Sequence, residues 1–390
     1  MRQIAFWLSL LLIFAIPWEN SAKFDGIGSL AKLLGVATAG IWVAMVARSG
    51  ELRRLRPFHI GALLFVLWNG LSVLWSVDIG GTFLRTITYA QTLVLVILLW
   101  DLYRTPEALR AGLQAFVLGA FVCVGLLGHA YFFEGGADAR RLTVMGFNPN
   151  VAAFGLVLAL PMAWYLARLD VVSRSARLWR WLNLAYLPLA MLAMVQTGAR
   201  SAMASAVVAF GFMILSLGQL RPVARVTFLV AVLASPALAL PFVSWEKLQR
   251  IASTSDEVSD GTFGGRHATW AEGMQLMAAH PWLGIGSGGF TVAAVETRKA
   301  PHNFVVALLV EVGIVGFVLF AGVMLWTGLD ALKQDRWLRR LWLTLLVMWV
   351  LNAAVHNYED KKHTWVLFSL VAVGAGLVQR EPEAVGAELR

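Results

Sequence analysis

Long apolar runs recur from one end of this sequence to the other, each close to the length of a membrane-spanning helix. A helix needs roughly 17 to 25 mostly apolar residues to cross a bilayer core, and windows of that length predict about twelve spans. The predicted spans are residues 4–17, 28–47, 58–75, 83–101, 111–133, 150–168, 181–196, 201–217, 223–243, 303–330, 338–356 and 363–379. The pattern therefore predicts an all-α polytopic membrane protein in which residues 1–390 form a single transmembrane domain.

One long polar segment, residues 244–302, interrupts this pattern between the ninth and tenth spans. It contains a helical pattern from His267 to Ala279, then a Pro-Trp-Leu-Gly stop and a glycine-rich stretch that ends at Phe290. It closes with a basic run and His302, directly before the next apolar window. We expect short helices in this loop, and we expect any chemistry to occur where the loop meets the membrane.

Basic residues cluster in alternate loops. The clusters are Arg48 with Arg53, Arg54 and Arg56; Arg168 with Arg174, Arg177 and Arg180; and Lys333 with Arg336, Arg339 and Arg340. By the positive-inside rule, these loops and both termini are expected in the cytoplasm. The opposite loops are expected to face outward, the long one included, because long loops are translocated largely regardless of charge. They are residues 18–27, 76–82, 134–149, 197–200, 244–302 and 357–362.

Composition supports the membrane assignment and argues against other classes of protein. The chain is 59% hydrophobic and only 14% charged, unlike a soluble domain. Its net charge of +9 is spread over short loops, so topology explains it and no nucleic-acid partner is expected. The single cysteine, Cys123, permits neither an intrachain disulfide nor a thiol metal cluster. The first apolar run resembles a signal peptide but lacks a small-x-small cleavage pattern, so we expect a retained first helix.

Arg200 is the first candidate for binding an anion. It lies in a very short outward turn at the predicted start of a helix, where unpaired backbone N–H groups and the helix dipole favour negative charge. Its outward position runs against the topological bias for arginine. An interfacial arginine that reaches the lipid headgroups is the alternative interpretation.

Arg266 is the second candidate. It follows Gly264 and Gly265 at the start of the helical pattern in the long loop, where glycines permit close backbone approach to a ligand. A guanidinium there can bind phosphate oxygens in bidentate fashion. A solvated loop arginine remains the alternative.

His302 is the candidate base. Its reference pKa of about 6.5 leaves the imidazole largely neutral near pH 7, so it can accept a proton from a substrate hydroxyl. Alternatively, His302 or Asn303 only caps the following helix. In a continuous helix over residues 303–330, Gly313 and Gly316 would share the face of His302 and form a groove for a lipid chain or a close helix contact.

Four further residues are weaker candidates. Glu311 is ionisable inside a predicted span, but it would lie on the face of the helix opposite His302, so we expect it to pair with another helix. Arg298, Lys299 and His356 lie near the outer interface and are possible secondary site residues. No metal site is expected, because the acidic residues between 256 and 260 lack a fixed ligand spacing.

Several short motifs occur in a characteristic order. They are Asn-Pro-Asn at 148–150, Thr-Gly-Ala-Arg at 197–200, Gly-Arg-x-x-x-Trp at 265–270, Pro-Trp-x-Gly-x-Gly at 281–286, Pro-His-Asn at 301–303, and Glu-x-Gly with a second glycine at 311–316. In this order and topology the chain resembles the O-antigen ligase and polymerase superfamily over roughly residues 140 to 380. The large outer loop ending in a histidine is similar to the O-antigen ligases themselves, which are glycosyltransferases of the GT-C type.

The resemblance implies transfer of O-antigen from undecaprenyl diphosphate to lipid A-core oligosaccharide, at the periplasmic face of the bacterial inner membrane. It implies His302 as the catalytic histidine and Arg200 and Arg266 as diphosphate-binding residues. Relatives often place Ser and Gly around the first arginine, where this chain has Ala199 and Ser201. A base and two guanidiniums suit a metal-independent inverting displacement without a cofactor. A lipid-linked O-antigen polymerase, a protein O-oligosaccharyltransferase and a lipid-linked glycan flippase or transporter remain alternatives.

Overall fold

The computed structural model describes residues 1–24, 28–134, 142–143, 148–169, 173–219 and 266–378, together with positions 222, 225–226 and 249. Within these residues the chain is almost entirely helical, and the sheet present is an antiparallel hairpin of β1 (Lys23–Phe24) and β2 (Gly28–Ser29). Eight of the described helices are long and apolar enough to cross a membrane. The prediction of an all-α polytopic membrane protein is therefore confirmed.

The helices before the long loop are α1 (Arg2–Ala15), α2 (Leu30–Ser49), α3 (Pro57–Leu71), α4 (Ile79–Leu102), α5 (Pro106–Phe133), α6 (Pro149–Ala167), α7 (Arg174–Thr197) and α8 (Arg200–Ser216). The helices within the long loop and after it are α12 (His267–Ala279), α13 (Phe290–Ala293), α14 (Phe304–Glu311), α15 (Gly313–Leu332), α16 (Arg336–Ala353) and α17 (Lys362–Val378). Short 3-10 segments are η1 (Ile16–Ser21), η2 (Ser72–Leu74) and η3 (Leu217–Gln219).

Eleven of the twelve predicted spans coincide with these helices, the tenth with the pair α14 and α15. The predicted ninth span, residues 223–243, lies almost wholly outside the described residues. The same holds for Gly264, Gly265 and the acidic residues at 256, 257 and 260. The predicted helical pattern from His267 to Ala279 is α12, with the same bounds.

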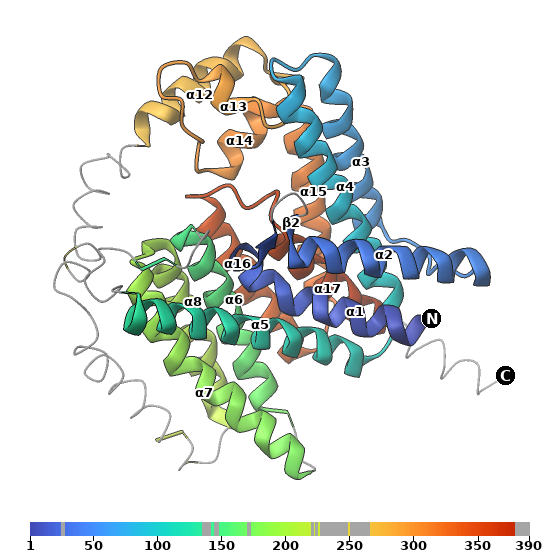
Figure 1. Cartoon of the computed structure of the whole chain (residues 1–390), viewed down its shortest axis with the longest axis vertical. Coiled ribbons are helices and arrows are strands. Elements are labelled where there is room, and N and C mark those ends of the chain that lie inside the picture. Colours follow the sequence, from blue (N-terminus) through green and yellow to red (C-terminus); the bar gives the residue numbers. More distant parts are fainter. Residues whose placement is uncertain are drawn as a thin grey trace.

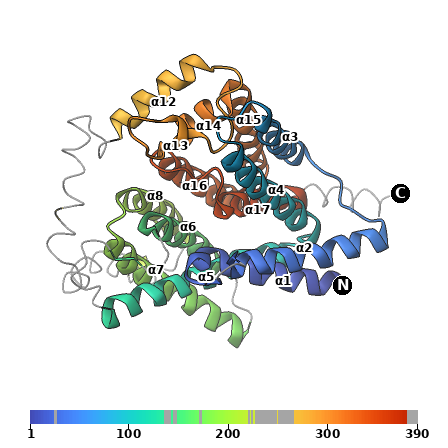
Figure 2. The same cartoon turned by 45° about the horizontal axis from the view of Figure 1, so that its top comes forward.

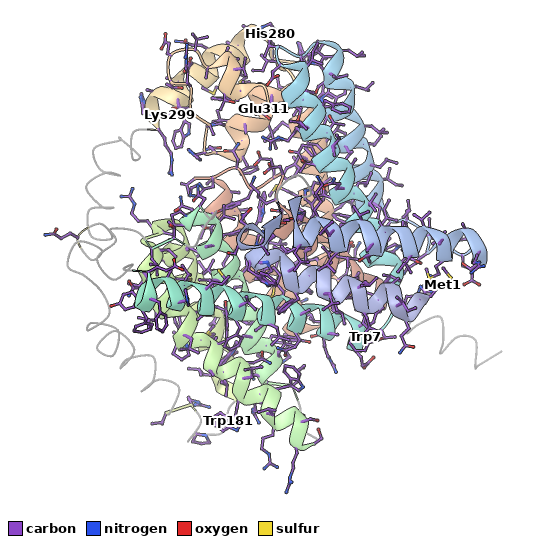
Figure 3. The ribbon with its side chains drawn as sticks, viewed as in Figure 1. Met1, Trp7, Trp181, His280, Lys299 and Glu311 are labelled. Carbon is purple, nitrogen blue, oxygen red and sulfur yellow. The ribbon has the colours of Figure 1, made fainter. Side chains whose placement is uncertain are left out.

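The helices form packed groups that share a buried core. Helices α12, α13 and α14 lie together at the top of the view, beside the upper ends of α3, α4 and α15 (Figure 1). The view turned by 45° keeps α3 beside α4 and α1 beside α2 (Figure 2). Helix α6 is enclosed by its neighbours and buries nearly all its side chains. Trp7 and Trp181 are 58% and 64% exposed at the periphery, as expected of side chains that face lipid (Figure 3).

The tenth span is broken, so the expectation of a continuous helix over residues 303–330 was wrong. Helix α14 ends at Glu311, and α15 begins at Gly313, whose φ is 66°. The segment from Pro281 to Gly286 packs into this break. Its backbone bonds are Ile285 N to Val310 O (3.0 Å), Gly286 N to Glu311 O (2.9 Å) and Ile314 N to Pro281 O (2.8 Å). The loop thus supplies partners to backbone groups that the break leaves without intrahelical bonds.

Of the two alternatives expected below His302, Gly316 makes the close helix contact and does not open a groove for a lipid chain. A Cβ on Gly316 would lie 2.9 Å from the ring of Trp68 and closer still to Val312, so this glycine is packed, not open. A Cβ on Gly284 would lie 2.6 Å from the backbone of Glu311. These glycines allow segments to approach closely, which is why they occur around the break.

Described residues in or beside the six loops predicted to face outward contact one another. Some of these contacts join two loops directly, and others involve a residue that borders a loop. They are Val77 N to Ile285 O (2.9 Å), Thr82 Oγ1 to Ser287 O (2.8 Å), Tyr358 OH to Asn150 O (3.1 Å), Leu142 N to Gln196 O (2.9 Å) and the Lys362–Glu19 ion pair. Described segments of loops far apart in sequence therefore contact one another, and a site there can draw on several of them.

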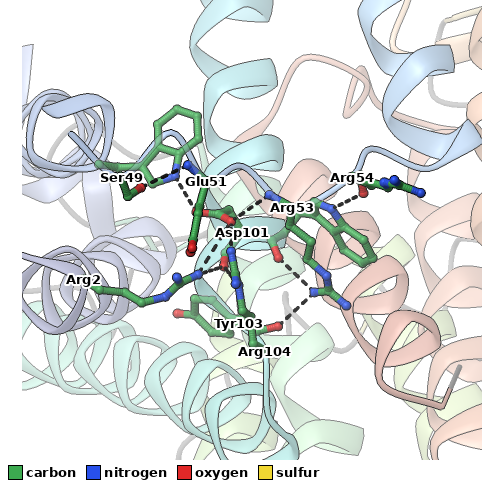
Figure 4. A network of polar contacts seen from close by, with 10 residues as sticks. Arg2, Ser49, Glu51, Arg53, Arg54, Asp101, Tyr103 and Arg104 are labelled. Carbon is green, nitrogen blue, oxygen red and sulfur yellow. Dashed lines mark hydrogen bonds and ion pairs between the residues drawn. The ribbon is translucent and has the colours of Figure 1, made fainter. Parts of the chain in front are cut away.

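The opposite end carries a polar network centred on Asp101 (Figure 4). This fully buried carboxylate accepts from Trp42 Nε1 and Arg53 N, both at 3.1 Å, and pairs with Arg104 at 2.5 Å and Arg2 at 3.6 Å. The network joins α1, α2, the segment after α2 and the end of α4. One member of this network, Arg53, belongs to an arginine cluster that the sequence assigned to the cytoplasm.

Candidate functional site

A cavity of about 440 Å³ opens where the outward-predicted loops meet. Its ionisable lining residues are Glu19, Arg85, His302, Glu311, His356, Tyr358, Asp360, Lys361 and His363. They come from η1, α4, the end of the long loop, α14 and the segment from α16 into α17. Excluding histidine and tyrosine, the lining carries three carboxylates and two cationic side chains, so it is not a strongly basic pocket.

His302 lines this cavity, and the chain on both sides of it is held. The residue before it, Pro301, accepts a hydrogen bond from Trp270 Nε1 at 2.7 Å. The residue after it, Asn303, is the N-cap of α14, and its side chain accepts from Val305 N at 2.9 Å. Of the two capping alternatives, the side-chain cap is therefore Asn303, which leaves the imidazole of His302 available to the cavity.

The ring of His302 lies beside that of His356, with centroids 5.5 Å apart and planes at 82°. Burial of the imidazole, followed by the positive charge of Arg266, lowers the pKa of His302 below its usual 6.5. The neutral, proton-accepting form therefore predominates near neutral pH. His356, a secondary candidate from the sequence, is thus brought directly to His302.

Arg266 stands at the N-cap of α12, close enough for its charge to act on both His302 and Tyr358. It is not among the residues that line the cavity. The structure therefore brings Arg266 beside the histidine but outside the enclosed space.

Arg200 is the first residue of α8, and it does not line the cavity either. Its end of α8 is fixed by neighbouring contacts: the preceding helix receives a bond from Leu142, and Ser205 accepts from Asn352 of α16 at 2.6 Å. Helix α16 leads into His356, so Arg200 lies at the same end of the molecule as the cavity. Arg298 and Lys299 are exposed, with Lys299 at the edge of the loop structure (Figure 3).

Glu311 is 8% exposed and lies in the interior beside the helix break (Figure 3). Its Oε2 accepts a hydrogen bond from the loop backbone, Gly288 N, at 2.8 Å. The positive charge of Arg85, from α4, also acts on Glu311. Glu311 and His302 line the same cavity from opposite ends of α14.

Sequence reasoning named Lys361 as a possible neighbour of the site but missed Arg85 and Asp360, with which it forms a charged group. Arg85 pairs with Asp360, which also pairs with Lys361 at 3.1 Å. Burial favours the protonated form of Asp360, but Lys361 and Arg85 outweigh it and lower the pKa. Burial and the neighbouring Asp360 raise the pKa of Glu359 to about 8. An arginine inside the predicted span 83–101 was the signal that could have identified Arg85.

Metal ligation finds no support among the residues that the structure describes, since no three His, Cys, Asp or Glu side chains there are arranged to hold an ion. In the cavity lining, Asp360 pairs with Arg85 and Lys361, and Glu19 pairs with Lys362.

Comparison with known proteins shows similarity to one family. Residues 184–321 match the family model described as O-antigen ligase. A protein of Pseudomonas aeruginosa named O-antigen ligase is 24% identical over 289 residues, which cover 68% of this chain and 63% of that protein. The chain thus matches less than two thirds of the length of that relative. The resemblance to O-antigen ligases is confirmed, and the matched segment contains Arg200, Arg266, His302 and Glu311.

Proposed function

We propose that this chain is an O-antigen ligase that transfers O-antigen polysaccharide from undecaprenyl diphosphate to lipid A-core oligosaccharide. The observation that carries the proposal is the position of His302, within the segment similar to O-antigen ligases and on the wall of a polar cavity. A polar cavity at a membrane-protein interface suits sugar hydroxyls, which need hydrogen-bond partners when they leave water.

In the proposed reaction, neutral His302 accepts the proton of an acceptor-sugar hydroxyl. The oxygen attacks the anomeric carbon of the donor sugar and forms the new glycosidic bond. The bond from that carbon to the diphosphate oxygen breaks, and undecaprenyl diphosphate leaves with the electron pair. A single displacement of this kind inverts the anomeric configuration. The lowered pKa of His302 supports the role, since the base must begin unprotonated.

The charges favour separate places for the sugar and the diphosphate. In the cavity, Arg85 and Lys361 both pair with Asp360, and the charge of Arg85 also acts on Glu311, so these two cations face two carboxylates. Arg266 lies beside His302 but outside the cavity lining. We therefore assign a sugar ring to the cavity and the diphosphate to Arg266, with Arg200 as the second guanidinium. Charge on the leaving diphosphate is stabilised by these two side chains, and no metal is required.

We place the site in the periplasm and the protein in the bacterial inner membrane, with both termini cytoplasmic and residues 244–302 as a periplasmic loop. Two observations support this orientation. Described residues of four loops predicted to face outward, 18–27, 134–149, 244–302 and 357–362, line the cavity. The Asp101 network, with its arginines, lies at the other end.

The test in cells uses a strain that lacks its own ligase and receives this chain with the matching lipid-linked donor. We expect the wild type to restore a lipopolysaccharide ladder and His302→Ala to abolish it, with lipid-linked donor accumulating on the periplasmic side. The matched control is His280→Ala, which removes an exposed histidine from the same loop and should keep the ladder.

Other products would identify the alternatives. Longer lipid-linked glycan without a ladder would indicate a polymerase, and glycosylated protein would indicate a protein O-oligosaccharyltransferase. Donor stranded on the cytoplasmic side in His302→Ala would indicate a flippase. An unchanged ladder in His302→Ala would remove the histidine base from the mechanism.

A further inference from the structure

Helix α12 holds the segment that ends in His302 at two points. Glu272, which is 8% exposed, accepts hydrogen bonds from Glu296 N at 2.9 Å, Thr297 N at 3.1 Å and Thr297 Oγ1 at 2.7 Å. Two residues earlier in α12, Trp270 Nε1 donates to Pro301 O at 2.7 Å. The first contact fixes the start of the segment and the second fixes its end.

The segment between these two points contains strained backbone. Arg298 has a φ of 49° and His302 a φ of 47°, and apart from glycines these are the positive-φ residues of the described chain. Left-handed backbone is costly for residues with a Cβ, so it persists only where surrounding contacts enforce it. Strain at these positions therefore indicates that the Glu272 and Trp270 contacts hold the segment in place.

The Trp270 bond acts on the peptide group that determines the orientation of His302. Pro301 O and His302 N belong to one planar peptide unit, so fixing the carbonyl restricts rotation about φ of His302. On the other side, Asn303 is fixed as the cap of α14 by its bonds to Val305 N and Val306 N. The Cα–Cβ direction of His302 is thereby set from both sides.

The same helix carries Arg266. Trp270 N donates to Arg266 O at 2.9 Å, so the indole and the arginine are joined by the first turn of α12. One rigid turn therefore connects the guanidinium assigned to the diphosphate with the peptide that sets His302. Any rotation of α12 would move both groups together.

We propose that Trp270 and Glu272 are positioning residues that hold His302 at a fixed distance and direction from Arg266. This inference rests on the proposed role of His302 as the base. The base and the leaving diphosphate act on opposite sides of one anomeric carbon, so their separation must be maintained during the reaction. Misplacement of a reacting group by about 1 Å can cost about 100-fold in rate.

The test is Trp270→Phe, which removes the indole N–H and keeps an aromatic ring. We expect kcat to fall about 10-fold to 100-fold with little change in KM for donor or acceptor, since binding groups are untouched. We also expect the acidic limb of the pH profile to move up toward pH 6.5. Burial and the charge of Arg266 lower the pKa of His302. A less restrained His302 would be better solvated and farther from Arg266, so its pKa would rise.

The matched control is Trp75→Phe. Trp75 Nε1 donates to the carbonyl of Leu283 at 3.1 Å, so this change removes the same kind of bond from the same loop, away from His302. We expect kcat and the pH profile of Trp75→Phe to match the wild type. Glu272→Gln weakens the bonds from Glu272 to Glu296 N and Thr297, and it should also lower kcat. This variant replaces Trp270→Phe in the test if Trp270→Phe does not fold.

The outcomes separate this inference from the proposed function. If His302→Ala is inactive while Trp270→Phe and Glu272→Gln both keep the wild-type kcat and pH profile, the positioning role is wrong and the base survives. If His302→Ala is fully active, the proposed function fails first. A rise in KM alone in Trp270→Phe would assign the indole to substrate binding and overturn positioning.

Discussion

Two features of its surroundings prepare His302 for the role of a base. Its imidazole is half-buried beside His356, and its backbone is held in a left-handed conformation by contacts on both sides. The sequence located His302 correctly at the junction of the long loop and a span. It could not reveal the Trp270 contact, because that bond joins residues 31 positions apart and follows no local pattern.

The pH dependence of the reaction follows from the same surroundings. Since the pKa of His302 is lowered, kcat/KM should stay high as pH falls to 6.5 and decline only below it. Removing the nearby cation by Arg266→Ala should move this limb to higher pH, although only in part, because burial is the larger cause. The measurement is kcat/KM against pH in detergent, with the exposed Lys299→Ala as control. A limb that moves equally in both variants would contradict the influence of Arg266.

The group around Arg85 shows a different limit of sequence reasoning at this scale. An arginine in a predicted span was visible, but its partner Asp360 lies 275 residues away. Only the folded chain brings α4 beside the segment after α16. The cavity wall is therefore built from ion pairs that no spacing in the sequence indicates.

Among the elements, the apolar windows predicted the helices closely because a membrane imposes both length and composition on a span. The tenth span is the exception. Between Phe304 and Trp326 its window is apolar except for Glu311, so hydrophobicity gives no reason for a break after that residue. The break depends on the segment from Pro281 to Gly286, which supplies backbone partners from the loop. A nonlocal contact of this kind overrides the local preference for a continuous helix.

Gly313 tests this account of the break. Its φ is 66°, and a Cβ would lie 2.2 Å from Trp282 O, so Gly313→Ala should destabilise the fold by about 2 kcal/mol or more. Gly322→Ala is the matched control in the same helix, because a Cβ there meets nothing within 4 Å. It should be neutral or slightly stabilising. Thermal unfolding in detergent compares the two, and equal melting temperatures would mean that the loop does not constrain the break.

At the scale of the whole molecule, the two ends differ in composition and contacts. At one end, described residues of four loops predicted to face outward line the cavity, and the other end holds the Asp101 network with Arg2, Arg53 and Arg104. The arginine clusters of the sequence predict a cytoplasmic side and an outer side, and Arg53 of one cluster belongs to the Asp101 network. The enclosed cavity could not be predicted, because its walls come from segments that are distant along the chain.

The central claim is that His302 and Arg266 perform metal-independent transfer at this end of the molecule. The most direct measurement is transfer of glycan from purified undecaprenyl-diphosphate donor to lipid A-core by the purified protein in detergent with excess chelator. We expect product from the wild type and from His280→Ala, and losses of at least about 100-fold in His302→Ala and Arg266→Ala. Full activity of His302→Ala, or wild-type product that forms only after a divalent metal is restored, would contradict the account.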